Sequence, residues 1–131
     1  MSYDYEQDIR EFFENNWNST EIAWPDYHFN KPSSTWVSFT YKENAGYQAS
    51  MGSPGTNRFR TLGMVTIQVF ALSGDASIDA REKAGLLKDL FRSGVTSGNV
   101  NFYDVTQQTI GVKNGWYQIN VKAYFKHDEI T

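Results

Sequence analysis

The chain alternates between two hydrophobic spacings, one typical of helices and one typical of strands. Apolar side chains recur every three or four residues in the segments 4–17 and 79–92, with polar residues at the other positions. This spacing gathers the apolar side chains on one side of an α-helix, so both segments are predicted to be amphipathic helices. Ser77 or Asp79 can cap the start of the second helix, and Gly94 follows its basic last turn.

Alternating apolar residues predict long strands at 35–42, 58–72 and 115–126. In the last of these, Trp116, Gln118, Asn120 and Tyr124 are predicted to face away from the core. Both faces of the segment 58–72 are partly apolar, so we expect a central strand that is covered on each side. Shorter strands are predicted at 20–24, 99–105 and 109–112, and a polar tail from residue 127. Asn114-Gly115 predicts a tight hairpin before the last long strand.

The segment Glu43–Asn57 separates two of the predicted strands. Its second half reads SMGSPGTN, a composition typical of turns. Residues 46–49 can extend the preceding strand after a break, and the whole segment can project as an arm. A binding arm and a plain hairpin connection are equally open interpretations. Gly63, in the following strand, indicates a bulge or a close approach of another group.

These elements predict a single domain that spans residues 1–131. The fold class is α+β, with a mixed, mostly antiparallel sheet of about five to six strands. Two helices pack on one face of this sheet, and a long loop or hairpin arm joins two of the strands. A chain of this length is typical of one domain.

Composition narrows the possible functions. The net charge is −3 and the basic residues are scattered, which argues against a general role in neutralising nucleic-acid phosphates. No apolar run approaches the roughly 20 residues that cross a bilayer, and no secretory leader is apparent, so we expect no membrane association. The absence of cysteine fits a reducing compartment and excludes a cysteine nucleophile.

The sequence offers little catalytic chemistry. It holds two histidines, neither beside a nucleophile motif, and no glycine-rich phosphate cradle between a strand and a helix. Two clusters are weak candidates for a metal site: Asp26 with His28, and His127 with Asp128 and Glu129. A surface histidine beside a solvated acid is the better interpretation of both clusters. Trp24, Trp36 and Trp116 can stack on sugars, and sheet packing explains each of them equally well. We predict no catalytic residue, no metal and no cofactor.

The predicted elements follow one another in a distinctive order, each with a characteristic local sequence. An N-terminal amphipathic helix with Ile9, Phe12 and Phe13 leads to Ile22-Ala23-Trp24-Pro25. A glycine-rich loop, a strand with Gly63 and Val65-Thr66-Ile67-Gln68-Val69-Phe70, and a helix follow. The chain closes with Gly115-Trp116-Tyr117-Gln118-Ile119-Asn120-Val121. In this order of elements and in these local sequences, the chain resembles the tail terminator proteins of long-tailed bacteriophages. The resemblance covers nearly the whole chain.

This resemblance implies a structural protein of the virion, and no enzyme. Such a protein forms a hexameric ring at the head-proximal end of the tail, where it contacts the tail tube protein and a head-completion or connector protein. DNA passes through its channel without specific binding, and assembly takes place in the host cytoplasm. The predicted oligomer and partner contacts, chosen by position, are Tyr47, Met51, Arg58, Arg60, Trp116, Gln118, Asn120 and Tyr124. An ordinary solvated sheet face is the alternative for these positions.

Three other functions stay open. One is a different component of the head–tail joint or the tail tube. The second is a sugar- or peptide-binding module that uses its aromatic faces. The third, and the weakest, is a small hydrolase or isomerase that uses Asp26 and His28.

Overall fold

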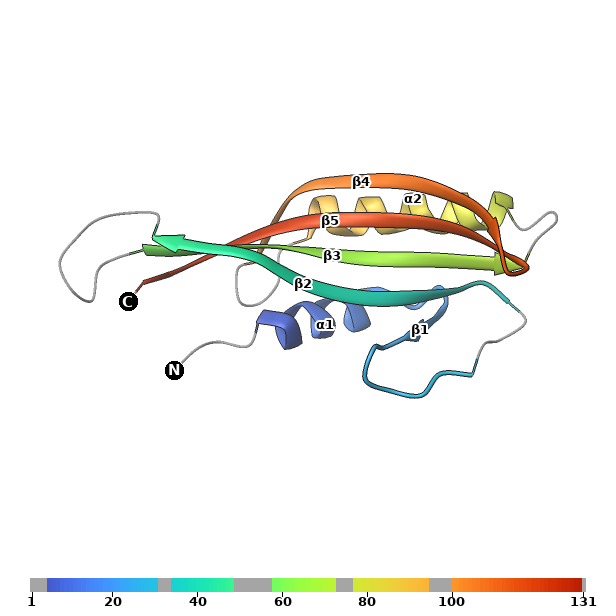
Figure 1. Ribbon diagram of the computed structural model, residues 1–131, viewed down its shortest axis with the longest axis horizontal. Coiled ribbons are helices and arrows are strands. Elements are labelled where there is room, and N and C mark those ends of the chain that lie inside the picture. The colour runs from blue at the N-terminus through green and yellow to red at the C-terminus, as the bar shows by residue number, and fades with distance from the viewer. Residues whose placement is uncertain (1–4, 31–33, 49–57, 73–76, 95–99, 131) are drawn as a thin grey trace.

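The fold is one mixed five-stranded sheet with two helices on the same face (Figure 1). The structure is a computed structural model and describes residues 5–30, 34–48, 58–72, 77–94 and 100–130. The helices are α1 (Tyr5–Asn16) and α2 (Ser77–Ser93). The strands are β1 (Glu21–Ala23), β2 (Trp36–Gln48), β3 (Arg58–Leu72), β4 (Asn101–Lys113) and β5 (Trp116–Ile130). This confirms the predicted α+β class.

The order of strands across the sheet is β1-β2-β3-β5-β4. Only the short contact between β1 and β2 is parallel, and the other three pairings are antiparallel. β3 is therefore central, as predicted: β5 pairs with it from Arg58 to Leu72, and β2 pairs with it from Phe59 to Phe70. β4 and β5 are joined by the predicted hairpin, in which Asn114 and Gly115 have φ of 54° and 82°. Two positive φ values are what a type I′ turn requires.

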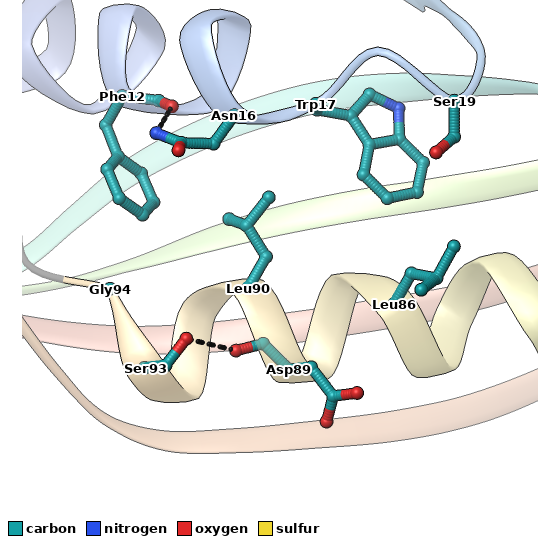
Figure 2. A pocket seen from close by; sticks show the side chains of 9 residues that line it. All are labelled: Phe12, Asn16, Trp17, Ser19, Leu86, Asp89, Leu90, Ser93 and Gly94. Atoms are coloured by element: carbon teal, nitrogen blue, oxygen red, sulfur yellow. Dashed lines mark hydrogen bonds between the residues drawn. The ribbon is translucent and has the colours of Figure 1, made fainter.

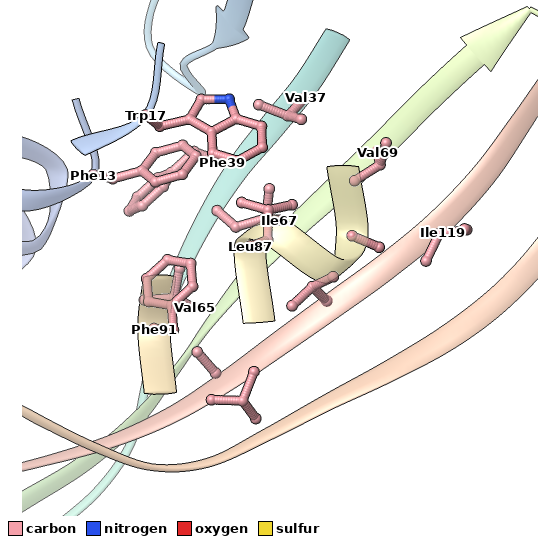
Figure 3. Close-up of a cluster of buried hydrophobic side chains, with 14 of the residues drawn as sticks. Phe13, Trp17, Val37, Phe39, Val65, Ile67, Val69, Leu87, Phe91 and Ile119 are labelled. Atoms are coloured by element: carbon pink, nitrogen blue, oxygen red, sulfur yellow. The ribbon is translucent and has the colours of Figure 1, made fainter. Parts of the chain in front are cut away.

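The core lies between the helices and the inner face of the sheet (Figure 3). Phe13 of α1 stacks on Phe39 of β2 and on Phe91 of α2, with ring centroids 5.9 Å apart in both pairs. The strands contribute fully buried residues at cross-strand positions, such as Val37, Val69 and Ile119 in one row. Because both helices meet the same set of strand residues, they cover one face of the sheet.

The structure corrects the prediction that β3 is covered on both sides. Its inner residues, such as Val65 and Ile67, are fully buried, whereas Met64, Thr66 and Gln68 on the other face are only partly covered. Neither helix packs on that outer face. The apolar strand residues on this outer face belong to β3 itself and to the strands beside it.

Two predicted strand boundaries are also wrong. Residues 99–105 and 109–112 were expected to be separate strands, but Asn101–Lys113 is one strand with register shifts around Tyr103 and Ile110. The last strand is predicted to end at Lys126, before a polar tail, but β5 runs to Ile130 and pairs with the start of β3. Pairing with β3 gives these polar residues backbone partners that their side-chain pattern does not reveal.

The predicted arm is in part a continuation of the sheet. β2 extends to Gln48 and pairs with β3 through a register shift between Glu43 and Ala45, which confirms the expected break and extension. Residues 49–57 lie outside the described residues. The segment Glu43–Gln48 is therefore a strand that reaches along the sheet rather than a loop.

Candidate interaction surface

The outer face of the sheet is the broad surface that the helices leave uncovered. Cross-strand register fixes its members, because residues opposite each other on antiparallel strands share a face. One row joins Trp36, Phe70 and Gln118, and the next joins Ser38, Gln68, Asn120 and Gln108. Further rows contain Thr40, Thr66, Lys122 and Thr106, and then Lys42, Met64, Tyr124 and Asp104. We call this surface the outer face.

One end of the outer face is aromatic. Trp36 stacks on Phe70 with ring centroids 4.3 Å apart, and it meets Trp116 edge to face at 5.9 Å. Phe29, from the segment after β1, covers Trp36 at 5.0 Å. Trp36 is 6% exposed, although it stands on the face that the helices leave bare. This cluster is a small second core outside the main one.

A hollow of about 270 Å³ opens beside this cluster. Amide side chains share its walls with the aromatic rings, and Lys113 and Asn114 of the hairpin stand at its edge. Aromatic rings with a few polar groups are typical both of protein interfaces and of small-ligand sites. The lining residues are Trp36, Gln68, Phe70, Lys113, Asn114, Trp116 and Gln118.

Five of the eight predicted contact residues lie on the outer face with described side chains. Trp116, Gln118, Asn120 and Tyr124 are partly exposed and lie on the outer face, as predicted for β5. Arg60 of β3 belongs to the same face by register and is partly exposed. Tyr47 and Arg58 lie on paired strands, at the end of β2 and at the start of β3. Met51 falls outside the described residues.

A second hollow, of about 460 Å³, lies between the two helices (Figure 2). Phe12 and Trp17 border it from the α1 side, and Leu86 and Leu90 from α2. Asn16 donates a hydrogen bond to the carbonyl of Phe12 and Ser93 donates one to the carbonyl of Asp89, both at 2.8 Å. These local bonds engage the side chains of Asn16 and Ser93. The other polar side chains of the lining are Ser19 and Asp89, so a single carboxylate is the charged group of the hollow. No pattern of residues along the chain indicates this hollow, because it forms only when α1 and α2 meet.

The weak catalytic candidates are engaged in separate contacts. Asp26 accepts a hydrogen bond from Nη1 of Arg10 at 2.9 Å, and His28 contacts Oδ1 of Asn30 at 3.1 Å. His127, expected on a polar tail, is instead 4% exposed and stacks on Tyr5 at 3.3 Å. Within the described residues, no group of three or more histidine or acidic side chains could hold a metal ion. In the same part of the chain, neither helix is long and apolar enough to cross a membrane.

A comparison of the sequence with models of known protein families matches this chain to one family. The sequence model of the phage tail terminator proteins matches residues 9–124, which is most of the chain. The chain belongs to the phage tail terminator family. It is therefore related to structural proteins of the phage tail rather than to enzymes. The virion tail is where such a protein resides.

The remaining comparisons concern the fold. One solved structure shares 18% of its residues with this chain and has a TM-score of 0.65. The alignment covers 92% of this chain and 94% of the solved one, so the whole tail terminator fold is similar. No curated protein matches this chain.

Proposed function

We propose that this tail terminator forms a hexameric ring that caps the tail tube. The ring ends polymerisation of the tube and offers a docking surface to the head. The match to the family over residues 9–124 carries this proposal. The partners in it are the tail tube protein and a head-completion or connector protein, and DNA passes through the channel without specific binding. Assembly takes place in the host cytoplasm, and in the virion the ring is located at the head-proximal end of the tail.

The surfaces of the molecule support a ring. A ring closes through a head-to-tail interface, in which each subunit uses two different surfaces. The outer face is broad, partly apolar and uncovered by helices, so it suits one half of such an interface. The paired ends of β2 and β3 extend the sheet towards residues 49–57, and Tyr47, Met51, Arg58 and Arg60 are our candidates for contact with the tube or the next subunit.

Light scattering with and without tail tubes tests this proposal. A discrete species with six times the monomer mass of 15.0 kDa is expected, either alone or once tubes are present. Electron microscopy of tubes assembled with the protein should then show tubes of limited length with a ring at one end. A tube subunit would instead polymerise by itself into long tubes. A strict monomer that leaves tube growth unchanged would refute the proposal.

The aromatic hollow favours one other candidate, a sugar- or peptide-binding module. Trp36 and Trp116 lie together beside the amides of Gln68 and Gln118, an arrangement that suits stacking with hydrogen bonds. This function predicts a monomer whose tryptophan fluorescence shifts when a sugar or peptide is titrated. A ring with unchanged fluorescence would exclude it.

A further inference from the structure

The outer face is basic although the chain as a whole has a net charge of −3. Lys122 lies between Thr66 and Thr106, and Lys126 lies between Leu62 and Asn101, so the cross-strand neighbours of both lysines are neutral. Five cations and one carboxylate with described side chains belong to this face, which gives it a formal charge of +4: Lys42, Arg60, Lys113, Lys122, Lys126 and Asp104. Asp128 shares the face by register, opposite Arg60, and its side chain lies outside the described residues.

The solvent side of α1 has the opposite charge. Glu11 and Glu14 are exposed, and Glu6 and Asp26 flank the single cation Arg10 at 2.8 and 2.9 Å. Together these four carboxylates and one cation give this side a formal charge of −3. Since α1 packs on the inner face of the sheet, its acidic side points away from the outer face. The molecule therefore carries two unlike charged surfaces on different sides.

We infer that the outer face of one subunit binds the acidic side of α1 in the next copy of this chain. This inference rests on the proposed ring and names the surfaces that build it. Opposite charges on different sides of one molecule are complementary only between copies, and they produce the head-to-tail contact that a ring needs. The aromatic end of the outer face adds the partly apolar area that a stable subunit contact requires.

A second copy suits the outer face better than nucleic acid does. A surface that binds phosphates is dominated by lysine and arginine, whereas the middle of the outer face holds amides and hydroxyls between its lysines. Ser38, Gln68, Asn120 and Gln108 form one such neutral row. The same chain also supplies the acidic surface, so no other partner is needed to balance the charge.

A charge swap between the two surfaces tests the inference. The first variant combines Lys122→Glu with Lys126→Glu, and the second combines Glu11→Lys with Glu14→Lys. Each is expected to weaken assembly at least tenfold, measured by light scattering at low salt. The variant with all four changes restores opposite charges across the contact and should regain assembly. An equimolar mixture of the two double variants should also assemble, because each then meets a complementary neighbour.

A matched control places the same change in charge elsewhere. Arg81→Glu with Lys88→Glu on α2 alters the net charge as the lysine variant does and should leave assembly unchanged. Thermal melts of every variant show whether the monomer is folded. The inference is overturned if both double variants assemble fully, or if the variant with all four changes stays as weak as they are. If the lysine variant loses binding to duplex DNA while its assembly stays intact, the outer face is a nucleic-acid surface. That result would also overturn the inference.

The proposed function fails in a different way. If the unaltered chain never assembles, with or without tail tubes, the ring itself is refuted. If it assembles and the charge variants assemble equally well, the ring stands and only the choice of surfaces is wrong.

Discussion

The ring of Phe125 lies over the backbone of Gly63, its partner across strands β3 and β5. A Cβ atom added at Gly63 would stand 2.3 Å from Cζ of Phe125 and 2.6 Å from the carbonyl oxygen of Lys42. Phe125 is fully buried and stacks on Tyr41 at 5.4 Å. The missing side chain at Gly63 thus makes room for an aromatic ring next to the register shift in β2.

Gly63→Ala should destabilise the fold. The added methyl group overlaps both a buried ring and a backbone carbonyl, so strands must shift to accept it. Overpacking of this kind costs about 1–3 kcal/mol in the free energy of unfolding. Urea denaturation of the purified variant measures this cost.

Gly85 provides the matched control. It lies within α2, and an added Cβ atom would meet nothing within 4 Å. Gly85→Ala should therefore stabilise the protein by about 0.5–1 kcal/mol, because alanine is the better helix former. Equal effects of the two substitutions would show that the ring of Phe125 does not restrict residue 63.

Leu87→Ala should lower the free energy of unfolding by ~2–5 kcal/mol. Leu87 is fully buried in the core, where its loss leaves a cavity between α2 and the sheet. Leu86, one position earlier, is 45% exposed, so Leu86→Ala should have a much smaller effect. A loss below about 1 kcal/mol for Leu87→Ala would mean that the face of α2 is wrongly assigned.

The pattern of residues predicts the long, regular elements of this fold well. Helix α1 was expected at 4–17 and is found at 5–16, and the bounds of β3 agree at both ends. In both cases a continuous apolar face decides the structure. The outward face of β5 was also predictable, because Trp116, Gln118, Asn120 and Tyr124 alternate with buried residues.

Features that depend on distant contacts could not be predicted. The middle of β4 reads Thr106-Gln107-Gln108-Thr109, with no apolar alternation, and only pairing with β5 makes it a strand. His127 is buried because Tyr5 of α1 stacks on it, a contact between the two ends of the chain. The basic outer face likewise appears only when the register places lysines from three strands on the same face of the sheet.

Gly115→Ala should destabilise the hairpin between β4 and β5. Gly115 has φ of 82°, a conformation that costs an L-residue about 1–2 kcal/mol. Nothing stands within 4 Å of the added Cβ atom, so the whole effect comes from the backbone. Asn114→Gly, at φ of 54°, should change stability little, because glycine accepts the same conformation. Thermal unfolding compares the two, and an unaltered melting temperature for Gly115→Ala would argue against the type I′ turn.

Reversal of charge at Arg58 and Arg60 should weaken assembly far more than folding. Both residues lie at the start of β3, where the sheet ends next to residues 49–57. Arg60 is partly exposed on the outer face, outside the main core, so the loss of its cation should cost the fold little. We expect Arg58→Glu with Arg60→Glu to reduce ring formation at least tenfold in light scattering, with a melt close to that of the parent. Arg60→Gln removes the cation without introducing a carboxylate, so it separates the loss of positive charge from its reversal. If the doubly reversed protein assembles like the parent, this end of the sheet does not take part in the ring.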